Sequence, residues 1–131
     1  DRAVRGRLPA NECYNANRFP SYHEWEGANF GISHPEVTAL ILEDWKLQPS
    51  LISAIRDHLP LREPFDENPA ATVLNLAGAI VEQLGFGPPG ESRHWCVTPE
   101  KLAGAGIDAE QFAQAAKDAQ HEFTRQRAAL Y

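Results

Sequence analysis

The sequence predicts an all-α domain of about five helices with no sheet. Apolar residues recur at intervals of three and four in several separate stretches, which is typical of amphipathic helices. Helix-starting residues precede these stretches, and glycine or proline follows most of them. No stretch alternates between apolar and polar residues for long enough to predict a strand. A length of 131 residues suits one domain with its own core.

Residues 1–19 contain few apolar residues and no helical pattern, so we expect an irregular arm there. The helical domain then covers residues 20–131. It opens with a short helix over 21–29, for which Ser21 is the predicted cap, with Glu24 three residues later. The aromatic residues expected to anchor this helix are Tyr22, Trp25 and Phe30.

The stretch 30–60 predicts two helices joined by a short turn, around which the rest of the chain is organised. Ser33 and Glu36 form an S-x-x-E capping box at the start of the first helix. Pro49 suits the first turn of the second helix, and Pro60 stops it. The first helix carries an apolar face of Val37, Leu40, Ile41 and Trp45. The second carries Leu51, Ile52, Ile55, His58 and Leu59.

This predicted hairpin brings two histidines together. Each helix is about a dozen residues, or roughly 18 Å, long. Because the connection is short, the two helices should run antiparallel. The start of the first should then lie beside the end of the second, so that His34 and His58 share one end of the hairpin.

Three further helices are predicted after the hairpin. Asn68 caps the first, which ends at Gly85, Thr98 begins a short one, and Asp108 with Gln111 caps the last. The predicted apolar face of the Asn68 helix is Val73, Leu74, Ala77, Ile80, Val81 and Leu84. That of the last helix is Phe112, Ala116, Ala119, Phe123 and Leu130, with His121 off this stripe and facing solvent.

Composition and charge indicate a cytoplasmic, soluble chain that contacts neither membrane nor nucleic acid. No apolar run is long enough to span a bilayer, and no signal peptide is visible. The net charge is −6, and the one basic group, Arg2, Arg5 and Arg7, reads as a solvated tail. Because the chain starts at Asp1 and contains no methionine, we expect it to be a piece of a longer product.

The two cysteines, Cys13 and Cys96, lie far apart and form no C-x-x-C motif, which favours reduced thiols. His94 lies two residues before Cys96, but the neighbouring Trp95 and Val97 indicate packing rather than a reactive thiol.

Four motifs in a fixed order resemble a known family. Glu26 followed by Phe30-Gly31 is similar to an E-x-x-x-F-G run. The hairpin of that family is similar to two segments here, H-P-E-V-T-A-L-I-L-E-D-W-K-L from His34 and A-I-R-D-H ending at His58. Its V-x-x-L-A-D-x-I helix is similar to T-V-L-N-L-A-G-A-I from Thr72. Over about residues 20 to 130 the chain thus resembles the C-terminal part of an HDOD domain. These are bacterial signalling relatives of the HD-domain metal-dependent phosphohydrolases.

The resemblance implies that the catalytic set of the HD enzymes is incomplete here. No His-Asp dipeptide occurs in the chain, and the reversed Asp57-His58 does not replace it. Leu59 stands where the family pattern has a second histidine, and Gly78 where catalytic relatives have an aspartate. His34 and His58 are the residual HD-like positions, and two imidazoles alone hold a divalent ion weakly. We therefore predict no catalytic residue, no cofactor and no firm metal site.

Several side chains remain as candidates for contacts. His34 is expected to define a helix start and His58 to be a partly buried, hydrogen-bonded core residue, with metal binding as the alternative. Glu26 should pair with an arginine such as Arg56, or face water. Trp45 and Arg56 are candidate lining residues of a pocket between the hairpin and the Asn68 helix.

Two classes of function follow. The resemblance implies a non-catalytic signal-transduction module, the output or scaffolding domain of a larger bacterial signalling protein. The alternative is a divergent metal-dependent phosphohydrolase acting on a nucleotide or phosphate ester. Because the predicted helices carry large apolar faces, we expect the chain to pack on a protein partner, on other domains of the parent protein or on a second copy.

Overall fold

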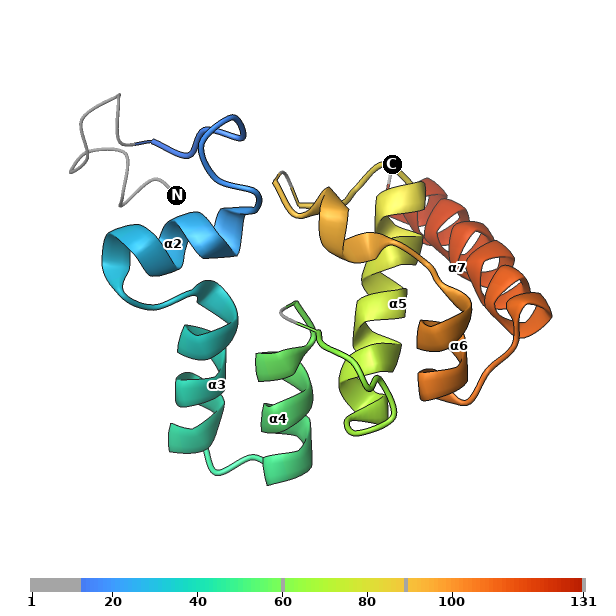
Figure 1. The fold of residues 1–131 in the computed structure, drawn as a ribbon. Helices are drawn as coiled ribbons and strands as arrows, with labels where there is room; N and C mark the ends of the chain where they lie inside the picture. The colour runs from blue at the N-terminus through green and yellow to red at the C-terminus, as the bar shows by residue number, and fades with distance from the viewer. Residues whose placement is uncertain (1–12, 60, 89, 131) are drawn as a thin grey trace.

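The computed structural model describes residues 13–59, 61–88 and 90–130. Within them it contains α-helices and one 3₁₀ helix and no strand, so the all-α prediction is confirmed (Figure 1). The α-helices are α2 (Tyr22–Phe30), α3 (His34–Asp44), α4 (Pro49–Asp57), α5 (Pro69–Gln83), α6 (Pro99–Ala105) and α7 (Ala109–Leu130), and the 3₁₀ helix η2 is Ser92–Trp95. Residues 13–19 of the predicted arm have no regular structure, while Arg2, Arg5 and Arg7 lie outside the described residues.

Most of the predicted helix starts form through the predicted side chains. The backbone N–H of Ser33 donates to Glu36 Oε2 at 2.8 Å, and the hydrogen bonds from Ser33 lower the pKa of Glu36. Asn68 and Thr98 each accept a hydrogen bond from a first-turn N–H of their helix, at 3.2 Å. Ser21 is the N-cap residue of α2 as predicted, but its hydroxyl makes no cap hydrogen bond and lies 3.1 Å from His23 Nδ1 instead.

The core lies where the end of α4, the middle of α5 and η2 meet. Its buried residues Leu59, Ala79 and Trp95 pack together, with Val97 and Phe112 against them. The hairpin of α3 and α4 is antiparallel, α4 also packs on α5, and α5 packs on η2 and α6 as well (Figure 1). Helix α5 is therefore the central element of the fold.

The predicted apolar face of α5 is wrong. The buried residues are Ala71, Thr72, Asn75, Leu76 and Ala79. Val73, Leu74 and Val81 are exposed instead. Small side chains let α4, α6 and η2 approach α5 closely, and the buried Thr72 and Asn75 make hydrogen bonds to backbone carbonyls. Close packing and these polar bonds decide the orientation of the helix, and hydrophobicity alone does not reveal it.

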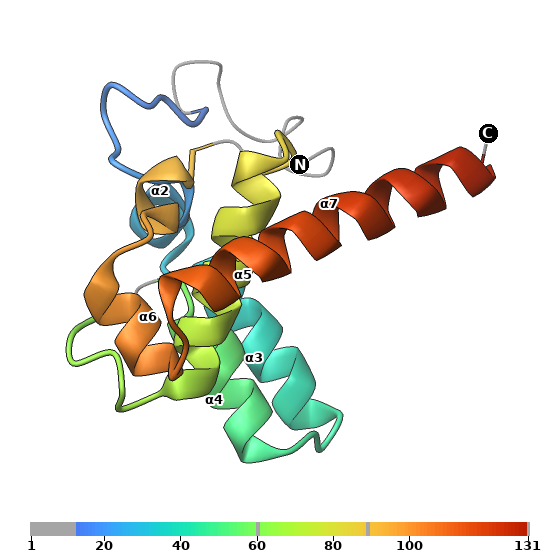
Figure 2. The same cartoon turned by 90° about the vertical axis from the view of Figure 1, so that its right-hand side faces the viewer.

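Helix α7 runs away from the other helices (Figure 2). It is 22 residues long and none of its residues is buried. Phe112 packs on the core, and the Phe123 ring lies 4.7 Å from that of Phe86, while the last turns are solvent-exposed. His121 faces solvent as predicted.

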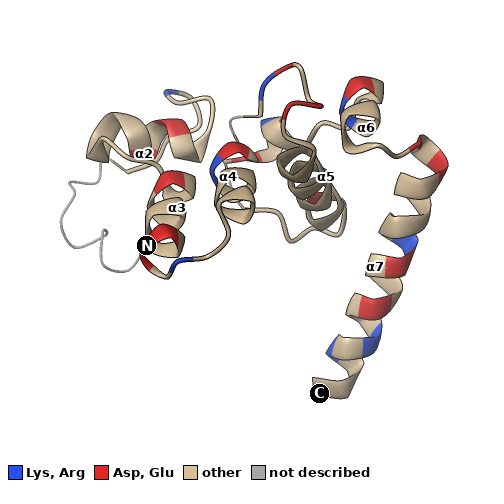
Figure 3. Cartoon of the chain, turned by 90° about the horizontal axis from the view of Figure 1, so that it is seen from below, with Lys and Arg blue, Asp and Glu red and all other residues tan. Residues whose placement is uncertain are grey.

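Positively and negatively charged residues are interspersed along the described part of the chain. Figure 3 shows Lys and Arg dispersed over several elements and interleaved with Asp and Glu. Among the residues described, no helix has the length and apolar character to cross a bilayer. Cys96 is an exposed free thiol, as predicted, and Cys13 is exposed as well.

Candidate functional site

His34 is the first residue of α3 and His58 directly follows α4, and because these helices are antiparallel (Figure 1) the two residues lie at the same end of the hairpin, as predicted. His34 belongs to a contact with Glu26: its Nδ1 lies 2.6 Å, and its backbone N 2.8 Å, from Glu26 Oε2. The expected pairing of Glu26 with Arg56 is wrong, because Arg56 pairs with Glu43 and joins α4 to α3. Glu26 and His34 thus fix the junction of α2 and α3, where Gly31 supplies the left-handed turn with φ of 73°.

His58 is a half-buried, hydrogen-bonded residue. Its Nδ1 donates to the Ile55 carbonyl at 2.6 Å, because a carbonyl oxygen can only accept, and Nε2 is then the nitrogen with the free lone pair in the neutral ring. The ring stacks on Trp95, and burial lowers the pKa of His58. The charges of His34, Glu91 and His23 also act on this ring.

Apolar packing fills the two positions at which the HDOD pattern and this chain differ. A Cβ atom on Gly78 would lie 2.3 Å from Cζ3 of Trp95, so the indole occupies the space that an aspartate would need. Leu59, at the place of the second histidine, is 2% exposed and packs in the core with Ala79 and Trp95. Neither position can supply a ligand in this fold.

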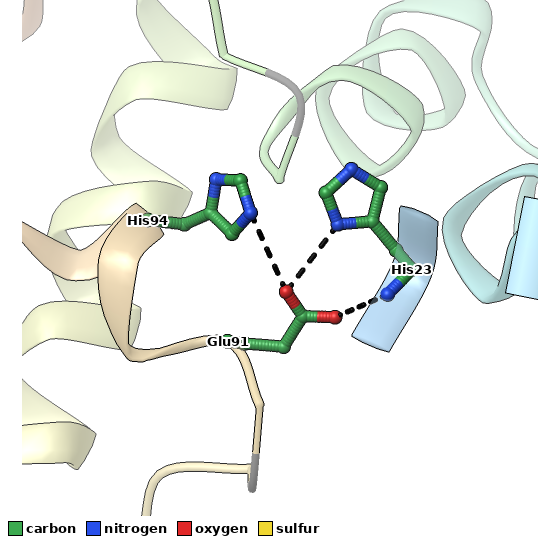
Figure 4. Close-up of side chains that lie close together, drawn as sticks. All are labelled: His23, Glu91 and His94. Atoms are coloured by element: carbon green, nitrogen blue, oxygen red, sulfur yellow. Dashed lines mark hydrogen bonds and ion pairs between the residues drawn. The ribbon is translucent and has the colours of Figure 1, made fainter. Parts of the chain in front are cut away.

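A separate group of ligand-type side chains joins α2 to η2. His23 of α2, Glu91 ahead of η2 and His94 within η2 turn toward one another (Figure 4). Glu91 Oε2 lies 3.3 Å from His23 Nδ1 and 3.5 Å from His94 Nε2. The Glu91 side chain is 1% exposed, and the two rings are 12% and 17% exposed. We call these three residues the His–Glu cluster.

Backbone contacts hold the His–Glu cluster in place. The N–H of Tyr22 donates to the Gly90 carbonyl at 3.0 Å, and that of His23 to Glu91 Oε1 at 2.8 Å. On the far side, Lys101 Nζ donates to the His94 and Cys96 carbonyls at 3.0 and 2.8 Å. The cluster therefore sits between two anchored segments that are distant in sequence.

Lys101 is also connected to His58, through the side chain of Asn75. Lys101 Nζ gives its third hydrogen bond to Asn75 Oδ1 at 2.8 Å, and Asn75 Nδ2 donates to the His58 carbonyl at 2.8 Å. Burial lowers the pKa of Lys101. The main chains of His58 and His94 are thus linked through two buried side chains.

Electrostatics favour the neutral form of His94. Burial, followed by the neighbouring His23, lowers its pKa to about 4, and its buried Nε2 has no hydrogen-bond partner. The rings of His23 and His94 are 4.8 Å apart, and the charges of His58 and His23 both act on His94. The cluster and His58 therefore form one electrostatically coupled group at the junction of α2, α4 and η2.

Sequence reasoning missed this cluster. The local signal was Glu91-Ser-Arg-His94, an E-x-x-H spacing that can place two ligands on one helical face. The third member lies 68 positions before Glu91, and no local pattern connects the two. Assigning His94 to packing alone also overlooked its buried, unpartnered Nε2.

The apolar face of α3 is open to solvent. Val37, Leu40, Ile41 and Trp45, which we call the α3 face, are 39, 53, 46 and 69% exposed. They lie side by side on the helix because they are spaced by three and four residues. Trp45 is therefore a surface residue. The pocket at the start of α5 runs along residues 61–68 with Asp57, and neither Trp45 nor Arg56 lines it.

Comparisons with protein-family models, with curated proteins and with solved structures found no match to this chain.

Proposed function

We propose that this chain is a non-catalytic, HDOD-type signal-transduction module of a bacterial protein that acts through the contacts of its helices. The observation that carries the proposal is the α3 face, whose apolar side chains are between 39 and 69% exposed. Contiguous exposed apolar side chains of this kind mark interaction surfaces.

The packing around Trp95 supports a role without catalysis. A hydrolytic metal centre needs at least three protein ligands and an open position. Trp95 fills the space beside Gly78, and Leu59 belongs to the core. The two positions that differ from the catalytic pattern, Leu59 and Gly78, thus lie in or against the hydrophobic core.

The occupant that we propose for the α3 face is α7 of a second copy. Helix α7 carries Phe123 and Leu130, both exposed, and runs away from α3 in its own chain (Figure 2). If each copy donates α7 to the other, the same contact forms twice about a two-fold axis and closes a dimer. Both partners of the contact are then present in one chain.

Burial of the α3 face can supply the required free energy. Fully burying a Val, Leu or Ile side chain is worth about 1.5–3 kcal/mol, so half-exposed residues offer about 1 kcal/mol each. The larger Trp45 adds more. The four residues together offer about 4–5 kcal/mol per face, and a symmetric dimer uses the face twice, against the cost of association.

Light scattering over a dilution series of the 131-residue chain tests this proposal. The wild type should approach the mass of a dimer as concentration rises. Leu40→Glu should weaken the association at least about tenfold, since it removes about 1 kcal/mol of burial and adds a charge that must be desolvated. Gln83→Glu is the matched control, because it adds the same charge at an exposed position of α5, outside both α3 and α7.

A wild type that stays monomeric at the highest concentration would refute docking between copies. So would a dimer that Leu40→Glu leaves intact. Circular dichroism of each variant shows whether the helices remain formed.

The alternative function, a divergent phosphohydrolase, is favoured by one observation: the two residual HD-like histidines do share one end of the hairpin. Incubating the chain with Mn²⁺ and a chromogenic phosphodiester distinguishes the two functions. A non-catalytic module gives no turnover. Turnover that His58→Gln abolishes would establish the enzyme instead.

A further inference from the structure

We infer that His23, Glu91 and His94 form a binding site for one divalent transition-metal ion of the zinc type, which ties α2 to η2. This site goes beyond the proposed function and does not depend on it. It also uses residues other than the HD-like positions His34 and His58. The close-up in Figure 4 shows both imidazoles directed at the Glu91 carboxylate.

The spacing of the donor atoms suits a small divalent ion. Two ligands bound tetrahedrally at about 2.1 Å lie about 3.4 Å from each other. Glu91 Oε2 is 3.3 Å from His23 Nδ1 and 3.5 Å from His94 Nε2. The three ligand atoms all lie within 4.8 Å of one another, so small side-chain rotations bring the third edge to the same length.

The buried carboxylate needs a positive partner. Glu91 is 1% exposed, and its ion-pair partners among the described residues are both imidazoles. An ionised carboxylate out of water is costly unless an opposite charge accompanies it. A divalent ion between the carboxylate and the rings supplies that charge and leaves both rings neutral, which is the form that binds metal.

One ring nitrogen at the site lacks a hydrogen-bond partner. His94 Nε2 is buried and has no hydrogen-bond partner, which is rare for a buried polar atom. A metal ion bound at this nitrogen satisfies it. His23 Nδ1 has Ser21 Oγ at 3.1 Å and Glu91 Oε2 at 3.3 Å as its neighbours, both of which can rearrange around an ion.

The surroundings fix the ligands as the outer shell of a metal site does. Glu91 Oε1 accepts the backbone N–H of His23, which orients the carboxylate and leaves Oε2 for the ion. Lys101 holds the main chain of η2 through the His94 carbonyl. Two imidazoles and one carboxylate suit Zn²⁺, Co²⁺ or Fe²⁺, with the remaining position open to water.

Titration of the metal-free full chain with Zn²⁺, followed by calorimetry, tests the site. One ion should bind per chain, and Co²⁺ should give the visible absorption of a protein-bound ion. His23→Gln and His94→Gln should each weaken binding at least about 100-fold, because removing a ligand costs no less than disturbing an outer-shell partner. His121→Gln on exposed α7 and His34→Gln, in the other His–Glu pair, are matched controls that should bind as the wild type does.

Absence of Zn²⁺ binding by the wild type would overturn the inference, and would show that a protonated imidazole alone compensates Glu91. Binding lost in His34→Gln but kept in His94→Gln would also overturn it. If the cluster variants do not fold, X-ray absorption of the wild-type zinc complex decides: two imidazoles and one carboxylate support the site, and any other ligand set refutes it. Light scattering with chelator present separates this result from the test of dimer formation.

Discussion

Replacing Gly78 by alanine tests whether the Trp95 ring fills the space that a side chain at position 78 would need. The added Cβ would lie 2.3 Å from Cζ3, 2.6 Å from Cε3 and 2.8 Å from Cη2 of the indole, all closer than real contacts allow. Because the ring is 8% exposed and packs against Leu59 and Ala79, it cannot move without disturbing the core.

The net effect follows from two opposing contributions. Alanine in place of glycine inside a helix stabilises by about 1 kcal/mol. Overpacking a core costs typically about 1–3 kcal/mol, and more where the neighbour is rigid. With three ring atoms inside contact distance, we expect Gly78→Ala to lower the free energy of unfolding by about 1–2 kcal/mol, or the Tm by roughly 3–8 °C.

Gly27→Ala provides the matched control. Gly27 also lies inside a helix, but a Cβ there meets nothing within 4 Å. The helix-propensity gain then acts alone, and we expect a stabilisation of about 0.5–1 kcal/mol. The two variants share the same chemical change and should shift stability in opposite directions.

Urea denaturation followed by circular dichroism measures both variants, and Trp95→Leu completes a double-mutant cycle. In the Trp95→Leu background the clash is absent, so Gly78→Ala should become neutral or stabilising, with a coupling energy of at least about 1 kcal/mol. If Gly78→Ala stabilises the wild type as much as Gly27→Ala does, the indole does not fill this position and the structural case against catalysis there fails.

The remaining predictions concern the buried polar groups. Lys101→Met should cost about 2–4 kcal/mol of unfolding free energy in urea titrations, because one buried and two part-buried acceptors lose their donor; a loss under 1 kcal/mol would contradict this. Asn68→Ala should cost about 1 kcal/mol and shorten α5 at its start, visible as faster hydrogen exchange there and contradicted by unchanged exchange. The unfolding free energy of the metal-free chain should fall as the pH falls from about 6.5 toward 4. The reason is that the unfolded chain protonates His94 at its ordinary pKa of 6.5, while burial holds the pKa of His94 in the folded chain at about 4. The loss is at most about 3 kcal/mol, and His94→Gln should remove most of it.

Local patterns were sufficient to predict the helices and their starts. Asn68 and Thr98 each accept a first-turn N–H of their own helix, and Glu36 accepts the N–H of Ser33, so a few neighbouring residues determine each helix start. The short turn between α3 and α4 likewise determined that His34 and His58 share one end.

The buried face of α5 and the His–Glu cluster depend on tertiary contacts. Asn75 is buried because Lys101 and the His58 carbonyl satisfy its amide, and neither lies near it in sequence. Glu91 finds its partner in His23 through the packing of α2 on the segment before η2. A ranking of residues by hydrophobicity cannot reveal either arrangement. It also cannot tell an apolar face that is buried within the chain from one that stays exposed, as the α3 face does.

Hydrogen–deuterium exchange at rising protein concentration tests most directly whether α3 and α7 dock between copies. Docking predicts that amides of α3, around Leu40, and of the second half of α7 exchange more slowly at high concentration, while those of α6 do not change. Leu40→Glu should abolish the difference and Gln83→Glu should keep it. Exchange in α3 that is independent of concentration would contradict the proposal that this face is a contact surface between copies.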